Sequence, residues 1–225
     1  MSLKVVVLLC SVYVLAWGQN KCCLPKQYQG SSGLTIANVG GLNTTTAVGT
    51  LSKGISTYAY DYTNKRDATI SNINVTTSVG TFPVTQHTIT DYKKSIRWVI
   101  TDKNCTAEAV DRNMSSPCIP DNATYIGEMV IGGVLQADQW RYTINGGMNA
   151  SMTVTNTCIP IDLTIYSYNT DGMMLESITL ADFMPKILAP HTFFNVPKNC
   201  PQKPPASQKT SNSEIKFPRF SFSRW

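Results

Sequence analysis

Residues 139–156 read QWRYTINGGMNASMTVTN, and this stretch decides the fold. Its two halves, 139–144 and 148–156, are rich in aromatic and β-branched residues and flank the sequence Asn145-Gly146-Gly147. Asparagine followed by glycine supplies the positive φ angles that tight hairpin turns require. The stretch therefore predicts two antiparallel strands joined by a short turn.

The same pattern recurs outside this stretch. Residues 161–168 (IDLTIYSY) and 173–180 (MMLESITL) flank a second turn, Asn169-Thr170-Asp171-Gly172. Aromatic or apolar residues stand at every second position at Tyr58, Tyr60 and Tyr62, and again at Ile96, Trp98 and Ile100. This spacing places side chains on one face of a strand. The sequence predicts an all-β fold, an antiparallel sandwich or curled sheet with short helical elements only.

One segment offers a short helix. Residues 180–188 (LADFMPKIL) begin with helix-compatible residues, but Pro185 limits how far a helix can extend.

The first 18 residues have the layout of a secretory signal peptide. One lysine precedes an apolar run over residues 5–14, and Ala16-Trp17-Gly18 follows with small residues at the cleavage positions. A membrane anchor is the alternative, but the run is shorter than the roughly 20 apolar residues that span a bilayer. We expect cleavage after Gly18, a secreted extracellular protein, and a single β domain over residues 19–200.

Cysteines and glycosylation motifs agree with secretion. Removal of the signal leaves six cysteines, an even number that predicts a disulfide framework and leaves the pairing open. Adjacent Cys22 and Cys23 lie too close along the chain to bond each other easily, so we expect two different partners. A zinc site is disfavoured, because no C-x-x-C pair is present. Six N-x-S/T motifs predict glycosylation at Asn43, Asn74, Asn104, Asn113, Asn122 and Asn149.

The net charge of +5 comes mainly from the C-terminal tail. Residues 19–200 are close to neutral, which argues against nucleic acid as a partner. Residues 201–225 are rich in proline and serine and predict a disordered basic and aromatic tail. The ending KFPRFSFSRW alternates rings with cations and is a candidate contact for an anionic membrane surface, the alternative being a tail without a partner.

The sequence lacks the common catalytic and phosphate-binding motifs. The chain has no G-x-S-x-G, no H-E-x-x-H and no phosphate-binding loop, so we expect no enzyme and no required cofactor. One loop could bind calcium through side-chain oxygens of Asp61, Asn64 and Asp67. The spacing of these residues does not fit an EF-hand, and the alternative is a solvated turn.

A binding function is what remains. A curled antiparallel sheet can enclose an apolar ligand, and its lining would come from alternating apolar residues; a solid core fits the same pattern. We expect the ligand pocket to be lined by Ile96, Trp98, Ile100, Met129, Ile131, Leu163 and Ile165, with Trp98 near the ligand.

Several motifs together resemble one family. The spacing of Cys22, Pro25, Tyr28 and Gly30 is similar to the start of mature ependymin-related proteins. Four further segments resemble successive blocks of that family, in the same order between Cys22 and Cys200: YKKSIRWVITDKNC, NATYIGEMVIGG with LQADQW, TVTNTCIPI, and MLESITLADFMPKILAPHTFFNVPKNC. The chain thus resembles a secreted invertebrate member of the ependymin-related family.

The resemblance implies two curled antiparallel sheets around a deep hydrophobic pocket, similar to bacterial lipoprotein-carrier proteins, often in a homodimer. It also implies association with lipid binding, calcium and cell–matrix adhesion, and no enzymatic activity. By this resemblance Cys22 pairs with Cys158 and Cys105 with Cys200, which leaves Cys23 for Cys118. The last bridge departs from the vertebrate pattern, whose remaining two cysteines are missing here.

We therefore expect a secreted glycoprotein that binds a lipid or another hydrophobic small molecule. The alternative is a structural extracellular or shell-matrix protein without ligand transport.

Overall fold

The computed structural model describes residues 21–41, 47–102, 104–144, 147–170 and 172–204. The expected signal peptide, the sequon at Asn43 and tail residues 205–225 lie outside the described residues. Within the described part, no helix has the length and hydrophobicity needed to cross a membrane.

Nearly all regular structure is β. The strands are β1 (Gln27–Gly40), β2 (Val48–Asp61), β3 (Arg66–Thr77), β4 (Gly80–Asp91), β5 (Ile96–Ile100), β6 (Cys105–Ala109), β7 (Thr124–Ile131), β8 (Leu135–Ile144), β9 (Met148–Thr155), β10 (Pro160–Tyr168) and β11 (Gly172–Met184). One short helix, α1 (Pro190–Phe194), follows. The segment 180–188, expected to start a helix, instead ends β11, because Leu180 and Ala181 pair with β1.

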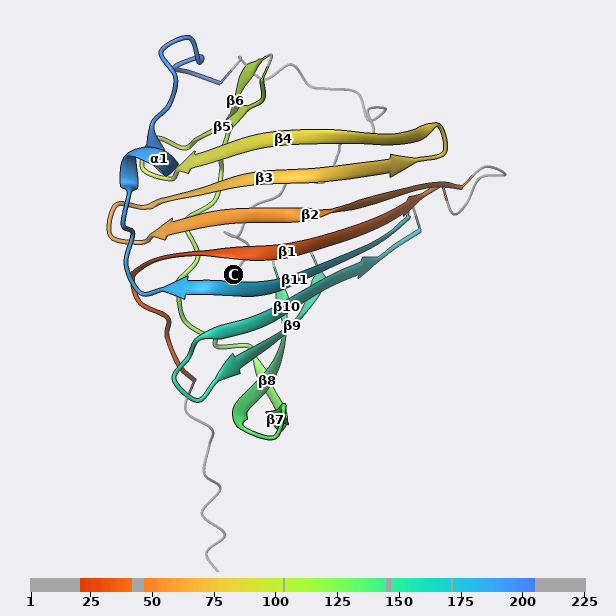
Figure 1. Ribbon diagram of the computed structural model, residues 1–225, viewed down its shortest axis with the longest axis vertical. Coiled ribbons are helices and arrows are strands. Elements are labelled where there is room, and N and C mark those ends of the chain that lie inside the picture. Colours follow the sequence, from red (N-terminus) through yellow and green to blue (C-terminus); the bar gives the residue numbers. More distant parts are fainter. Residues whose placement is uncertain (1–20, 42–46, 103, 145–146, 171, 205–225) are drawn as a thin grey trace, which may run out of the picture.

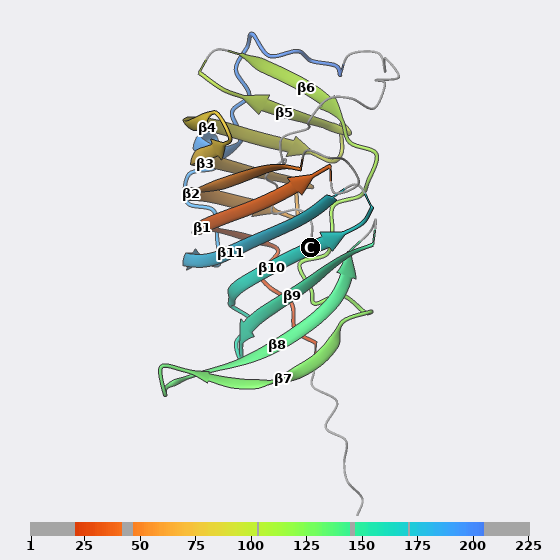
Figure 2. The same ribbon diagram turned by 90° about the vertical axis from the view of Figure 1, so that its right-hand side faces the viewer.

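The strands form one antiparallel sheet in the order β6-β5-β4-β3-β2-β1-β11-β10-β9-β8-β7 (Figure 1). The resemblance implied two sheets, but β1 pairs with β2 along one edge and with β11 along the other, so the hydrogen bonding is continuous. The sheet bends strongly, and the strands at its two ends turn toward the same side (Figure 2).

Both predicted hairpins are confirmed. Ile144 pairs with Met148 where β8 meets β9, and Tyr168 pairs with Met173 where β10 meets β11. In the second turn the Gly172 amide donates to the Asn169 side-chain oxygen at 2.9 Å. The asparagine and glycine of that turn therefore act as the sequence pattern predicts.

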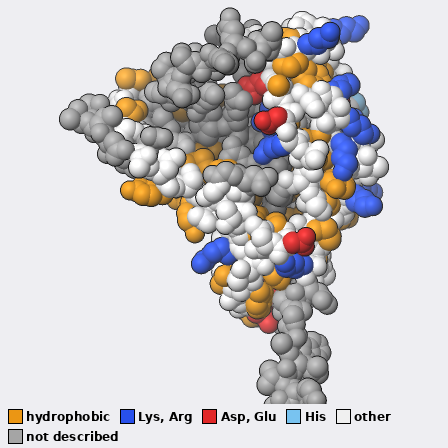
Figure 3. All heavy atoms as spheres, turned by 180° about the vertical axis from the view of Figure 1, so that it is seen from behind, with side chains coloured by type: hydrophobic (Ala, Val, Ile, Leu, Met, Phe, Trp, Pro, Cys, Tyr) orange, Lys and Arg blue, Asp and Glu red, His pale blue; other side chains and the backbone are white. Residues whose placement is uncertain are grey.

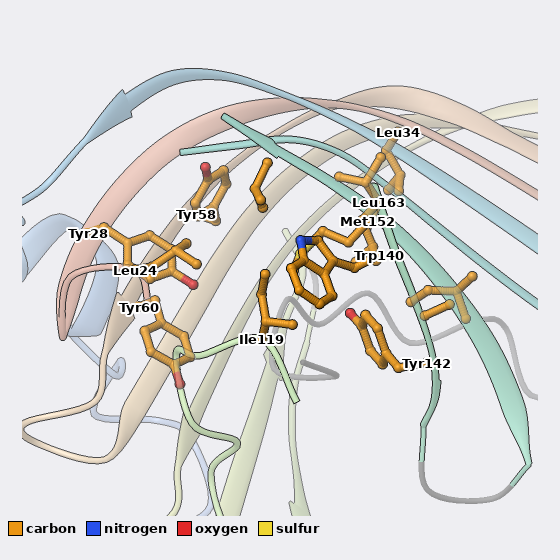
Figure 4. Packing of buried hydrophobic residues seen from close by; sticks show 14 of the residues in the cluster. Leu24, Tyr28, Leu34, Tyr58, Tyr60, Ile119, Trp140, Tyr142, Met152 and Leu163 are labelled. Atoms are coloured by element: carbon orange, nitrogen blue, oxygen red, sulfur yellow. The ribbon is translucent and has the colours of Figure 1, made fainter. Parts of the chain in front are cut away.

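The two faces of the sheet can be followed by register, because successive side chains of a strand point to opposite faces. Leu34 of β1 pairs with Gly54 of β2 and with Ile178 of β11, and all three share one face. We call this the inner face, since the strands arch over its side chains (Figure 4), and the opposite side the outer face.

A large apolar cluster covers the inner face. It includes residues from β1, β2, β3, β8, β9, β10 and β11 and from two segments outside the strands. Its members are Leu24, Tyr28, Leu34, Ile36, Tyr58, Tyr60, Ile73, Val75, Met114, Ile119, Trp140, Tyr142, Ala150, Met152, Val154, Leu163, Ile165 and Ile178. Burial of so much apolar surface is the main source of stability for this part of the fold.

A smaller cluster lies on the outer face beneath α1. Phe193 of α1 and Cys200 pack with side chains of β2 to β6, including Ile96 and Trp98. The His87 ring nitrogen lies 2.8 Å from the Phe193 carbonyl oxygen and donates to it. This end of the sheet is therefore covered on its outer side as well.

Candidate ligand site

Residues 110–123 form a strap across the inner face. The disulfide Cys23–Cys118 joins the strap to the segment before β1. Two backbone hydrogen bonds flank this disulfide: the Leu24 amide donates to the Pro117 oxygen at 2.8 Å, and the Ile119 amide to the Cys22 oxygen at 3.0 Å. Both contacts hold the strap against the curved sheet.

Side chains of the strap reach the sheet directly. Met114 and Ile119 are buried members of the inner cluster. The Tyr60 hydroxyl of β2 donates to the Ser115 carbonyl oxygen, and the Val110 amide donates to the Ser95 oxygen at 2.9 Å. The strap is therefore a cover for the apolar inner face and not a free surface loop.

A hollow of about 730 Å³ lies between the strap and β8. Its walls are strap residues 111–115 and 120–122 and β8 residues 142–144. Met114 and Tyr142 belong both to this wall and to the inner cluster, so the hollow adjoins the apolar interior. Seen from the inner side, acidic, basic and apolar side chains stand close together on this surface (Figure 3).

Aromatic rings dominate the interior next to the strap (Figure 4). Tyr28 stacks on Tyr60 with a centroid distance of 4.9 Å and meets Tyr58 edge-on at 6.1 Å. Burial raises the pKa of all three hydroxyls, and also that of Tyr142. These tyrosines therefore stay protonated and able to donate hydrogen bonds at any physiological pH.

Two donors of β8 in this interior have no hydrogen-bond partner among the described residues. Trp140 and Tyr142 of β8 are only 3% and 4% exposed, and neither the Trp140 Nε1 nor the Tyr142 hydroxyl contacts an acceptor. Their cross-strand neighbours on β9 are Met152 and Ala150, whose side chains carry no oxygen. Unpaired buried donors cost free energy, so they are unusual features of a packed protein interior.

A buried carboxylate lies farther along the inner face. Asp67 of β3 is 2% exposed, and burial raises its pKa, while Tyr92, Arg97 and the strap residue Arg112 act in the opposite direction. The attraction to Arg112 links the strap to β3 electrostatically.

The three residues expected to bind calcium are not brought together. Asp61 and Asp67 project from opposite faces, since Tyr60 is the register partner of Asp67 and Arg66 that of Asp61. Burial opposes ionisation of Asp61, but hydrogen bonds from Asn64 and Gln27 prevail and hold its pKa below the ordinary value. Among the described residues, no group of three or more His, Cys, Asp or Glu is placed to hold a metal.

The seven residues expected to line one pocket lie in three places. Leu163 and Ile165 belong to the inner cluster. Ile96, Trp98 and Ile100 pack on the outer face instead, where the Trp98 indole donates to the Pro201 carbonyl oxygen at 2.8 Å. On the edge strand β7, Met129 is half-buried and Ile131 is 38% exposed, outside both clusters.

Arg97 explains why Trp98 faces outward. Arg97 pairs with Thr90 across β4 and β5, and its Nε donates to the Thr90 hydroxyl at 3.1 Å on the inner face. Trp98, one residue further, must therefore point to the outer face. Tyr142, which lines the hollow, and Trp140, which belongs to the inner cluster beside it, alternate in QWRYTI and were detectable by the same period-two rule.

The three disulfides are those that the resemblance implied: Cys22–Cys158, Cys23–Cys118 and Cys105–Cys200. The adjacent cysteines thus reach two different partners, one at the turn between β9 and β10 and one in the strap. Three disulfides fit a protein that folds in an oxidising compartment.

The described sequons lie at or near the surface. Asn74, Asn104, Asn113 and Asn122 are exposed, whereas Asn149 is half-buried. Asn113 and Asn122 stand at the wall of the hollow, and the Asn122 amide donates to the Thr143 carbonyl at 2.9 Å.

Comparison with known proteins identifies the family of this chain. The family model Ependymin matches residues 81–200, which include β5 to β11, the strap and four of the six bonded cysteines. The chain belongs to the ependymin family. Among curated proteins, none matches the sequence.

A solved structure with a similar outline is an uncharacterized conserved protein from Thermus thermophilus. The similarity has a TM-score of 0.43 at 9% sequence identity and covers 77% of this ependymin-family chain and 87% of that chain.

Proposed function

We propose that this ependymin-family protein is a secreted glycoprotein that binds a lipid or another hydrophobic small molecule between the inner face and the strap. The observation that carries the proposal is the junction at Met114 and Tyr142, where a hollow large enough for a small ligand meets an aromatic and apolar interior. Ligand pockets are usually concave and mostly apolar. Here the wall of the hollow is mainly polar, and the apolar surface is that of the interior behind Met114 and Tyr142.

The strap supports the same proposal. A ligand can enter such an interior only if part of its cover moves. The strap is joined to the rest of the fold by a disulfide and separate hydrogen bonds rather than by a continuous β ladder. The covalent link at Cys118 allows the strap to shift without leaving the sheet. The protein would then retain one closed form and exchange ligand through limited movement.

The test uses the full secreted chain with the methyl ester of a dansyl-labelled undecanoic acid as probe. Trp140 belongs to the inner cluster and Trp98 to the outer one, so energy transfer from tryptophan to the bound probe should fall strongly in Trp140→Phe. It should persist in the matched variant Trp98→Phe. Absence of saturable probe binding to the wild-type protein would refute the proposal.

A second candidate function, a structural extracellular protein, rests on the edge strand β7. Its hairpin with β8 carries exposed apolar side chains, among them Val130 at 55% and Val134 at 88% exposure. An edge strand with exposed apolar residues is suited to pairing with a further copy, as in a homodimer or a larger assembly. Light scattering across a concentration series tests this: growth beyond a fixed small oligomer favours a structural role.

A further inference from the structure

We infer that the ligand of this site carries an uncharged oxygen that accepts hydrogen bonds from Trp140 and Tyr142. The inference rests on the proposed function, because it names the chemical class that the same site selects. It starts from the two buried donors of β8 for which the described part of the chain offers no acceptor.

The chemistry of the two groups defines what they need. An indole N–H can only donate, so its partner must be an acceptor atom. The Tyr142 hydroxyl stays protonated, because burial raises its pKa, and it too is available as a donor. Tyr142 also forms part of the wall of the hollow, and its hydroxyl is buried behind that wall, so a ligand reaches this donor only when the strap moves.

The described side chains around the two donors offer no hydrogen-bond acceptor for them. Both side chains belong to an inner cluster made entirely of apolar and aromatic residues. Phenylalanine would fill much the same space at position 142 without the cost of an unpaired hydroxyl. A ligand oxygen would remove that cost and gain two hydrogen bonds away from water, where such bonds are strongest.

Burial of the two donors favours an uncharged oxygen. The wall of the hollow is balanced in charge, because Asp111 and Asp121 contribute two carboxylates, Arg112 contributes a guanidinium, and the Lys21 ammonium donates to the Asp121 carbonyl oxygen. The two donors lie deeper, in the apolar and aromatic inner cluster. A carboxylate head group would lose its hydration on reaching them. An ester, ketone or alcohol oxygen has far less hydration to lose, so we expect an apolar chain that bears one such group.

The experiment compares three molecules with the same chain length: dodecane, methyl dodecanoate and dodecanoate. Each is titrated into the full secreted protein by displacement of the dansyl probe. We expect the ester to bind at least about tenfold more tightly than the hydrocarbon, which corresponds to about 1.4 kcal/mol. Dodecanoate should bind more weakly than the ester.

The variant Tyr142→Phe isolates the donor. It should reduce the ester-to-hydrocarbon ratio to about threefold or less, and continued displacement of the probe by dodecane shows that the site still folds. The matched variant Tyr166→Phe removes a hydroxyl from an exposed tyrosine of β10 and should leave the ratio unchanged.

The outcomes separate the two proposals. If dodecane and the ester bind equally well, or if dodecanoate binds best, the inference is overturned while a hydrophobic binding function stands. If none of the three molecules displaces the probe and the probe itself does not bind, the proposed function fails and the inference fails with it. An unchanged ratio in Tyr142→Phe also overturns the assignment of this residue.

Discussion

Removal of the disulfide that holds the strap should increase hydrogen exchange in the strap by more than the lower free energy of unfolding of the whole protein explains. The perturbation is the double variant Cys23→Ala/Cys118→Ala, which leaves no unpaired thiol. In the wild type this bridge closes a loop with a sequence separation of 95. A matched control exists, because Cys105–Cys200 has the same separation but ties down the cover of the outer face.

The expected magnitude follows from the chain between the cysteines. If no other disulfide were present, the chain-entropy model would give a stabilisation of about 4.7 kcal/mol for a loop of this length. The bridge Cys22–Cys158 provides a shorter detour, one residue from Cys23 to Cys22 and 40 residues from Cys158 back to Cys118. With a loop of about 41 residues the loss becomes about 4 kcal/mol, an upper figure because residual structure in the unfolded chain reduces it.

For the control bridge the corresponding detour is about 56 residues, which changes the figure by only about 0.3 kcal/mol. Both double variants should therefore lose nearly the same free energy of unfolding in urea titrations followed by circular dichroism. The difference should appear in amide hydrogen exchange under native conditions. The amides of Leu24 and Ile119, which donate across the strap bridge, should lose protection in the strap variant and keep it in the control.

Two results would refute this reasoning. If Leu24 and Ile119 exchange equally slowly in both double variants, the disulfide does not hold the strap. If the strap variant loses less than about 1 kcal/mol, the loop entropy assigned to this bridge is wrong.

Further predictions concern stability and pH. Gly54→Ala should cost about 1–3 kcal/mol or more, because its Cβ would lie 2.1 Å from the Asn72 oxygen; Gly33→Ala, with nothing within 4 Å, should stay within about 1 kcal/mol of the wild type in the same urea titration. Asp67 has a raised pKa in the fold, so the folded state binds the extra proton. The wild type should therefore lose stability relative to Asp67→Asn as pH rises above about 4, and a constant difference between pH 4 and 7 would contradict this. Asp61 has a lowered pKa, so its contribution should be present above about pH 4 and vanish on acidification, which unfolding of Asp61→Asn at pH 2 to 6 measures.

Local sequence signals predicted both hairpins and the strands around Tyr58 and Trp98. Turn residues such as those at 169–172 act within a few positions of the chain, and the hairpin between β10 and β11 follows from them directly. The pairing of β1 with β11 could not be predicted in this way, since it joins residues far apart in the sequence. For that reason the sequence could not distinguish one continuous sheet from two.

Prediction of the candidate site from the sequence failed for a different reason. Period-two alternation correctly grouped Ile96, Trp98 and Ile100 on one face of a strand, but alternation does not say which face of the sheet is the inner one. Both faces are covered at this end, the inner one around Asp67 and the outer one by α1. Arg97, which lies opposite Thr90, was the residue that could have indicated the orientation.

The adjacency of Cys22 and Cys23 has a consequence for oxidative folding. Exchanging their partners would lengthen one loop by a single residue and shorten the other by a single residue, so loop entropy barely distinguishes the native pairing from its isomer. A thiolate at either position can attack the disulfide of its neighbour, which makes the two isomers readily interconvertible while any thiol remains free.

Backbone geometry must then select between the isomers. Cys23 and Cys118 face each other in an isolated antiparallel bridge, flanked by the two hydrogen bonds of Leu24 and Ile119. Correct oxidation therefore requires the strap to be docked before the last disulfide closes. The native disulfide pairing thus depends on a backbone arrangement that has already formed.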